Sequence, residues 1–264
     1  MNFAIHQASR IGGRRYNQDR VAYAYSNQSL LLVLADGMGG HSHGEVAAQL
    51  AIQVFTDAFV QFAQPRISAP QEFLKEATLL AHDAIIHCAH EQQLGGNPGT
   101  TCVAALLQDG EVFWAHVGDS RLYFLRGQET LTRTRDHSMV QQLADWGMIN
   151  EDEMKTHPDR NKITNCLGGV QDAPIVESSD AMPLQRGDTV LLCSDGLWGY
   201  LSETEIATML ADSPVRGGLE LLMDVASSRG DTHSDNSTVI AVRWGATELA
   251  HPTRSPIVVM LDCS

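Results

Sequence analysis

Several features that would assign this chain to a particular class of protein are missing from its 264 residues. The five cysteines form no Cys-x-x-Cys pair and are odd in number, so neither a zinc ribbon nor a disulfide framework is indicated. No apolar run is long enough to cross a bilayer, and the first residues lack the basic and apolar regions of a signal peptide. We therefore expect no membrane insertion, a cytoplasmic location and reduced, mostly buried thiols.

Basic residues are also scarce. Lysine and arginine number 18 against 32 acidic residues, which gives a net charge of -14 at pH 7. Nucleic acids and anionic membranes are therefore not expected as partners, because both need a basic surface. Solubility is the simpler explanation of the acidity, and the alternative is a concentration of acids around a cation site.

No internal repeat or linker interrupts the sequence before Trp244, so we expect one domain over residues 1–244. Residues 245–264 differ in composition, with two prolines followed by the apolar run Ile257–Leu261. The sequence assigns no role to this tail. It could be disordered, an edge strand or a segment that binds a partner.

The most informative feature is a set of isolated aspartates. Asp36 follows the apolar run Leu30–Ala35 and opens a glycine-rich turn, and Asp195 follows a second apolar run and precedes a glycine. Asp119 and Asp235 lie in two further turns. Glycine lets the backbone approach closely at such a strand end. Four carboxylates that are far apart in the sequence suggest a hard-cation site for Mg²⁺ or Mn²⁺ rather than Zn²⁺.

The chemistry that fits such a site is phosphate ester hydrolysis. Arg14 or Arg15 could present a planar fork to a phosphate. Two ions bridged by Asp36 would acidify a water and supply a hydroxide for in-line attack. A cysteine phosphatase is not indicated, because no Cys-x5-Arg run is present. Taken singly, each Asp-Gly could be a simple turn and Arg14 a solvated surface residue.

The hydrophobic pattern indicates an α+β protein. The Asp109-Gly110 pair between two β-like runs predicts a hairpin, Asp136 is a candidate N-cap, and Ser202 with Glu205 fits a capping box. Residues 150–169 read as a polar, irregular and mobile loop. Strands are expected over residues 3–7, 21–25, 30–35, 101–108, 111–117, 121–126, 189–193 and 238–243, and helices over 44–62, 71–93, 136–146, from 203 onward, and over 218–229. Because strands and helices do not alternate regularly, packed antiparallel sheets flanked by helices fit better than a parallel sheet.

With these residues in place, the chain resembles the metal-dependent protein serine/threonine phosphatase family (PPM, type 2C) in its compact bacterial form, over about residues 3–244. The matching motifs occur in the family's order. They are Arg14-x-x-Asn17-Gln18-Asp19, Asp36-Gly37-Met38-Gly39-Gly40-His41-x-x-Gly44-Glu45, Gly99-Thr100-Thr101, His116-Val117-Gly118-Asp119-Ser120-Arg121, Leu131-Thr132 leading to Asp136-His137-Ser138, Leu167-Gly168, Ser194-Asp195-Gly196-Leu197 and Asp235-Asn236-x-Thr238.

The resemblance implies a central β-sandwich of two antiparallel sheets with helix pairs on both outer faces, and a binuclear Mn²⁺/Mg²⁺ centre at one end. It assigns Asp36 as the bridging ligand, Gly37 as a carbonyl ligand, and Asp195 and Asp235 as further ligands. Arg14 would hold the substrate phosphate, and Asp119 would bind a weaker third metal. Gln18 and Asp19 would contact metal-bound water. Residues 150–169 occupy the position of the family's variable flap.

Three positions depart from the family pattern. Gln18 stands where many members carry glutamate, which makes one contact to metal-bound water neutral. Met38 stands where eukaryotic members carry a histidine proposed as general acid, so that role would fall to a metal-bound water or another group such as His41. Gly199 stands where many members carry an aspartate ligand of the third metal. We therefore expect the third metal to bind weakly.

The leading hypothesis is a monomeric phosphatase that acts on phosphoserine and phosphothreonine in proteins and opposes a bacterial serine/threonine kinase. Retention of the carboxylates and Arg14 argues against the alternative of a silent phosphoprotein-binding relative, since acids repel one another without a metal. A hydrolase of small phosphate esters is the other alternative. Among secretion, cell division and cell-wall synthesis, the resemblance to short bacterial members favours secretion control.

Overall fold

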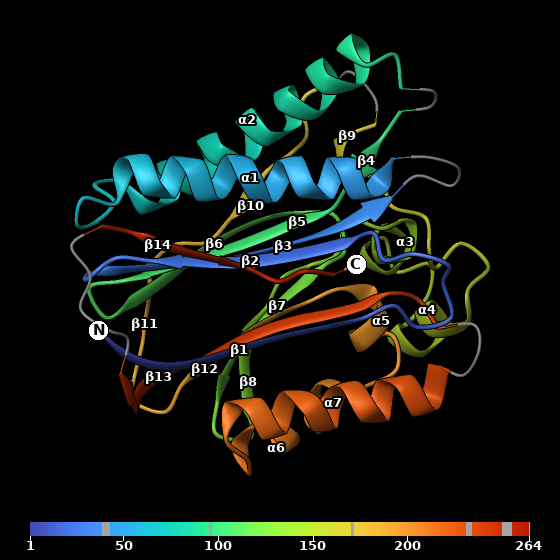
Figure 1. Cartoon of the computed structure of the whole chain (residues 1–264). Coiled ribbons are helices and arrows are strands. Elements are labelled where there is room, and N and C mark those ends of the chain that lie inside the picture. Colours follow the sequence, from blue (N-terminus) through green and yellow to red (C-terminus); the bar gives the residue numbers. More distant parts are fainter. Residues whose placement is uncertain (39–42, 95–96, 170–171, 231–233, 250–254, 264) are drawn as a thin grey trace.

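The computed structural model describes residues 1–38, 43–94, 97–169, 172–230, 234–249 and 255–263. Its strands form two antiparallel sheets that pack face to face (Figure 1). The first sheet has the order β1-β13-β12-β7-β8, formed by Asn2–Arg10, Ser237–Leu249, Thr189–Cys193, Arg121–Arg126 and Glu129–Arg133.

The second sheet has the order β10-β6-β5-β3-β2-β14. Its strands are Glu177–Ser178, Glu111–Val117, Cys102–Gln108, Ser29–Met38, Asp19–Tyr25 and Ile257–Met260, and β11 (Met182–Pro183) also pairs with β6. At one end of this sheet, β4 (Gly99–Thr100) pairs with the last residues of β3 on one side and with β9 (Leu167–Gly168) on the other.

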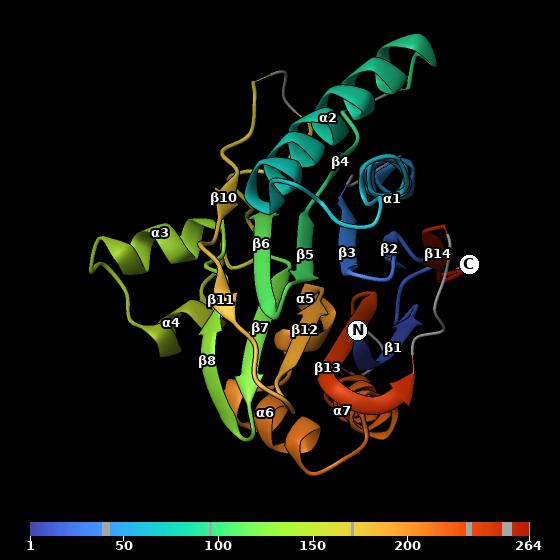
Figure 2. The same cartoon turned by 90° about the vertical axis from the view of Figure 1, so that its left-hand side faces the viewer.

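Helix pairs cover both outer faces, so the molecule has four layers (Figure 1). Helices α1 (Gly44–Phe62) and α2 (Pro70–Glu91) cover the second sheet, and α6 (Glu203–Ala211) and α7 (Val215–Gly230) cover the first. Helices α3 (Met139–Asp145) and α4 (Glu151–Thr156) project to one side, as Figure 2 shows. The short helix α5 (Asp195–Trp198) directly follows β12.

The core consists of three apolar layers, one for each interface between neighbouring layers of the fold. Strand β3 explains why the sheets pack closely, because Leu30, Leu32 and Leu34 face the other sheet while Leu31 and Val33 face α1 and α2. Both faces of this strand are therefore buried, which accounts for its uninterrupted apolar sequence. Within the described residues, no helix combines the length and apolarity needed to cross a membrane.

The predicted α+β sandwich with helix pairs on both sides is confirmed. The Asp109-Gly110 hairpin is present, with positive φ angles of 56° and 79°, and Ser202 and Glu205 form the predicted capping box. All five cysteines are free, and three of them are buried.

Two local predictions are wrong. Helix α3 is capped by Ser138 rather than Asp136, because both carboxylate oxygens of Asp136 bind Arg121 at 2.7 and 2.8 Å. The loop over 150–169 is also more regular than predicted, since it contains α4 and β9. For residues 257–260 the structure shows one of the three alternatives, an edge strand on β2.

Candidate metal centre

The aspartates singled out in the sequence meet at one end of the sandwich, and both sheets contribute them. Asp19 begins β2 and faces Asp36 near the end of β3 in the second sheet. Asp195 follows β12 and Asp235 precedes β13 in the first sheet, and Asp119 lies in the turn between β6 and β7. Burial, and after it the negative charge of each of the other four carboxylates, raises the pKa of Asp36, which places those four within electrostatic reach of Asp36.

The backbone around Asp36 is held by two threonines. The Asp36 carbonyl accepts hydrogen bonds from the Thr100 hydroxyl and the Thr101 N–H, each at 2.9 Å. The Asp36 N–H donates to the Thr101 hydroxyl at 3.1 Å, and that hydroxyl lies 2.7 Å from the Ser120 hydroxyl beside Asp119. The two threonines therefore fix Asp36 and link it to the turn that carries Asp119.

Gly37 lies where only glycine fits. A Cβ atom there would stand 2.3 Å from the carbonyl oxygen of Gly44, at the start of α1. Helix α1 therefore packs directly against the backbone of β3 beside Asp36. Gly37 directly follows Asp36 in the chain, and the resemblance expects its carbonyl as a ligand.

Asn236 connects the ligand loops of the first sheet to the loop between β1 and β2. Its side-chain oxygen accepts from the N–H of Gln18 at 2.8 Å, and its amide donates to the carbonyls of Ile11 and Tyr16. The loop that carries Arg14 is thereby held beside Asp235. The side chain of Arg14 is half exposed and donates to Asp235 Oδ2 at 2.5 Å.

The side chain of Ser194 links the two sheets next to Asp19. The Ser194 hydroxyl donates to Asp19 Oδ2 at 2.8 Å and accepts from the Thr238 N–H at 2.9 Å. The second oxygen of Asp19, Oδ1, is buried and has no hydrogen-bond partner among the residues that the structure describes. Asp119 Oδ1 and Asp195 Oδ1 are likewise buried and unpartnered among the described residues.

The raised pKa values of these carboxyl groups indicate that the site is suited to bind cations. Burial, more than any charge, raises the pKa of Asp19 to about 6 and of Asp119 to about 7, and it raises the pKa of Asp36 and Asp195 well above the usual range. Three buried carboxylate oxygens without a donor are costly in a native protein. Divalent cations are the partners that would satisfy them, and an all-oxygen set favours Mg²⁺ or Mn²⁺.

The residues that depart from the family pattern take distinct positions. The Gln18 amide donates to Glu45 Oε2 at 3.3 Å, so a carboxylate does stand beside this neutral side chain, but it comes from α1. Met38 pairs with Gly99 at the end of β3. Gly199 follows α5, and its own helical turn approaches so closely that a Cβ would lie 2.9 Å from the Asp195 carbonyl oxygen. His41 lies outside the described residues.

Sequence reasoning assigned no role to several residues that build the site. Thr100, Thr101, Ser194, Asn236 and Trp198 make the hydrogen bonds that hold the ligand loops, and Trp198 does so by donating to the Asp119 carbonyl at 3.0 Å. Four of the five occur inside the quoted motifs and the fifth follows one directly, so their position next to the aspartates was the available signal.

Comparison with known proteins shows which family the chain belongs to. The sequence profile of the protein phosphatase 2C family matches residues 6–226. A serine/threonine phosphatase, stp, of Listeria monocytogenes is 32% identical over 241 residues, covering 89% of this chain and 93% of that protein. The protein phosphatase PhpP of Streptococcus pneumoniae is 31% identical over 235 residues, covering 88% and 94%.

Solved structures extend the likeness to three dimensions. The serine/threonine phosphatase Stp1 from Staphylococcus aureus is 31% identical, with a TM-score of 0.82 over 93% of this chain and 96% of that one. The catalytic domain of the phosphatase PstP, solved with two manganese ions, is 31% identical, with a TM-score of 0.76 over 91% and 97%. The chain belongs to the protein phosphatase 2C family of serine/threonine phosphatases.

Proposed function

We propose that this enzyme hydrolyses phosphoserine and phosphothreonine in protein substrates at the end of the sandwich where the five aspartates meet. The observation that carries the proposal is a set of three buried carboxylate oxygens, on Asp19, Asp119 and Asp195, for which the described part of the chain supplies no donor. Such a set is unstable alone and well suited to divalent cations.

The residues divide into distinct roles. Asp36, the Gly37 carbonyl, Asp195 and Asp235 would hold two Mn²⁺ or Mg²⁺ ions, and Asp119 a third. When bound, the ions supply a nucleophile at neutral pH by acidifying a water, and they offset charge on the phosphoryl oxygens. Gln18 and Asp19 would orient water next to the ions.

Arg14 would bind the substrate phosphate. Its guanidinium is half exposed and lies against Asp235, so one edge remains available to an incoming phosphate. A bidentate contact would fix the ester in line for attack, and the pairing with Asp235 would hold the side chain in position before the substrate arrives.

We propose that the third ion binds more weakly than the other two, because Gly199 supplies no carboxylate to assist Asp119. We also propose that the enzyme acts as a monomer against a cognate serine/threonine kinase. Residues 1–244 would carry the phosphatase domain, to which the end of β13 and the edge strand β14 are added.

The decisive experiment is hydrolysis of a phosphothreonine peptide with and without Mn²⁺, for the wild type and Asp36→Asn. Asp57→Asn is a matched control, because Asp57 is exposed on α1. We expect metal-dependent turnover that Asp36→Asn abolishes and the control retains. Absence of turnover from a folded, metal-loaded protein would instead support a phosphoprotein-binding relative, and faster hydrolysis of nucleotides than peptides would support a small-ester hydrolase.

A further inference from the structure

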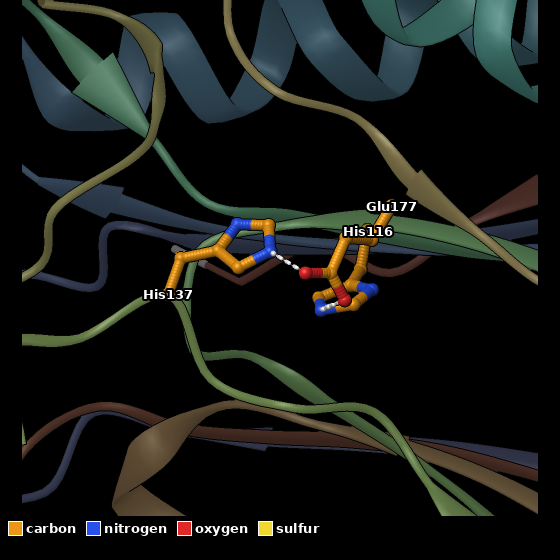
Figure 3. Close-up of side chains that lie close together, drawn as sticks. All are labelled: His116, His137 and Glu177. Carbon is orange, nitrogen blue, oxygen red and sulfur yellow. Dashed lines mark ion pairs between the residues drawn. The ribbon is translucent and has the colours of Figure 1, made fainter. Parts of the chain in front are cut away.

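A second cluster of ionisable side chains lies beside the turn that carries Asp119. His116 on β6 and Glu177 on β10 are paired in register, and His137 precedes α3 (Figure 3). The two imidazole rings stack with centroids 4.7 Å apart, and Glu177 approaches both of them, 3.4 Å from His137 Nε2 and 3.8 Å from His116 Nε2. One ligand atom from each residue falls within 4.8 Å of the others, which is compatible with a metal site.

The hydrogen bonds around the rings argue against a metal there. His116 Nε2 lies 2.7 Å from the Arg135 carbonyl, which can only accept, so this nitrogen carries the proton. His137 Nδ1 receives the N–H of Gly118 at 3.2 Å, so in the neutral ring the proton lies on Nε2. This buried nitrogen is 3.4 Å from a Glu177 carboxylate oxygen, a charge contact rather than a hydrogen bond of good geometry. A cation between the rings and Glu177 would have to displace both protons. The geometry therefore indicates a hydrogen-bonded network with fixed tautomers.

Within this network, His137 binds both polar backbone groups of Gly118, the residue before Asp119. Besides the Gly118 N–H on its ring, the His137 N–H donates to the Gly118 carbonyl at 3.0 Å. Gly118 has a φ of 104° and packs so closely on Thr101 that a Cβ would lie 2.6 Å from that side chain. The backbone of Gly118, which leads directly into Asp119, is therefore held from two sides, by Thr101 and by His137.

His137 also binds the last part of the flap. Its carbonyl accepts from the Thr164 N–H at 2.8 Å, and Asn165 Nδ2 lies 2.7 Å from its Nδ1. The orientation of the Asn165 amide is fixed, because its two ends bind the carbonyl and N–H of Ile175. His137 thus joins the Asp119 turn to residues 164–177.

We propose that His137 is a positioning residue for Asp119, and that Asn165 and Glu177 hold its ring in the tautomer that accepts the Gly118 N–H. The proposal rests on the proposed function, since it takes Asp119 as a metal ligand. Burial lowers the pKa of both His116 and His137, which agrees with neutral rings. Loss of the ring would free the Gly118 peptide and loosen the third metal.

The test compares His137→Gln with His87→Gln. His87 is a matched control because it also pairs with a glutamate, Glu91, but on the exposed face of α2. In Mn²⁺ titrations by calorimetry, we expect His137→Gln to weaken the weakest site about tenfold, as loss of a residue that orients a ligand does. Peptide turnover should fall mainly in kcat and return at high Mn²⁺, which a general loss of folding would not allow. Unchanged isotherms and kinetics would overturn the proposal.

Two further measurements keep the test independent of the folding of that variant and of turnover. Asn165→Ala should weaken the same metal site in the same direction but less strongly, since the Gly118 hydrogen bond remains. Nitrogen NMR of the imidazoles should show an unprotonated Nδ1 and a protonated Nε2 on His137. The opposite tautomer would overturn the proposal, and ring nitrogens that shift on binding Zn²⁺ would replace it with a metal site. If the wild type bound Mn²⁺ without hydrolysing peptide, the proposed function would fail while this proposal could still stand.

Discussion

At the scale of the residue, the site combines groups that destabilise the protein without metal. Asp119 is the clearest case, because its Oδ1 is buried without a donor from the described residues, and burial raises its pKa to about 7. A carboxylate whose pKa is higher in the folded than in the unfolded chain favours folding at low pH. That contribution is complete below about pH 4 and is lost as the pH rises towards 7.

Asp119→Asn should therefore stabilise the metal-free protein, and more so at higher pH. We expect the difference from the wild type in EDTA to grow by up to about 1.4 kcal/mol for each pH unit between 4 and 7. Urea unfolding at pH 5, 6 and 7 measures it. Taking the difference removes the opposing effect of His82, His116 and His137, whose lowered pKa values weaken folding at acidic pH in both proteins. A difference that shrinks as pH rises would contradict the prediction.

With Mn²⁺ present the sign should reverse for the same substitution. The ion needs ionised carboxylates, so its contribution to folding grows as the pH rises. Asp119→Asn should then be the less stable protein at pH 7, because it loses one ligand. Thermal unfolding of both proteins over a range of Mn²⁺ concentrations would check this, and equal shifts in Tm would argue that Asp119 binds no ion.

At the scale of the element, two glycines show how closely the site is built. Gly196 in α5 lies where a Cβ would stand 2.1 Å from the carbonyl oxygen of Asn236, so this helix packs directly on the loop beside Asp235. Gly217 in α7 has no atom within 4 Å of its Cβ position and is helical. The same substitution therefore has opposite consequences at the two positions.

Gly217→Ala should stabilise the protein by about 0.5–1 kcal/mol, because alanine restricts the unfolded chain and favours the helix. Gly196→Ala should destabilise it by several kcal/mol and weaken metal binding, since backbone must move apart between Asp195 and Asp235. Chemical denaturation and Mn²⁺ titration of both variants measure the two effects. A Gly196→Ala protein with wild-type affinity for Mn²⁺ would show that α5 does not fix the spacing of the ligands.

Elements with strong local signals could be predicted from the sequence, and those set by distant contacts could not. The Asp-Gly hairpin and the Ser202 capping box are each formed by residues that are close together in the sequence, so both are found where predicted. Asp136 satisfied the local rule for an N-cap, but Arg121 lies 15 residues away and takes its carboxylate. At the site, the aspartates were visible through their motifs. The roles of Asn236 and Ser194 depend on partners about 40 to 220 residues away and carry no local signal.

At the scale of the whole molecule, strand β14 completes the edge of the second sheet. It pairs with β2 from Ile257 opposite Tyr25 to Met260 opposite Ala22, and the Leu261 N–H donates to the Val21 carbonyl at 3.2 Å. Beyond the strand, Cys263 is buried in the apolar layer between the two sheets. These residues cover a strand whose other end carries Asp19.

Removal of residues 255–264 should consequently lower stability by about 2–4 kcal/mol, through lost burial of Leu261 and Cys263 and an unpaired edge on β2. The truncated protein should also self-associate more readily, because an open edge strand is a template for pairing. Thermal unfolding and light scattering measure the two outcomes. Wild-type stability in the truncated protein would show that this segment contributes nothing to the folded domain.

The division of the ligands between the two sheets has a consequence beyond turnover. Ions bound by Asp36 on one sheet and by Asp195 and Asp235 on the other would link the two sheets of the sandwich. At a free concentration 100 times the dissociation constant, one such ion adds about 2.7 kcal/mol to stability. A cell depleted of Mn²⁺ and Mg²⁺ would therefore lose the protein to proteolysis as well as losing its activity. The abundance of the phosphatase would then follow the metal supply without any change in gene expression.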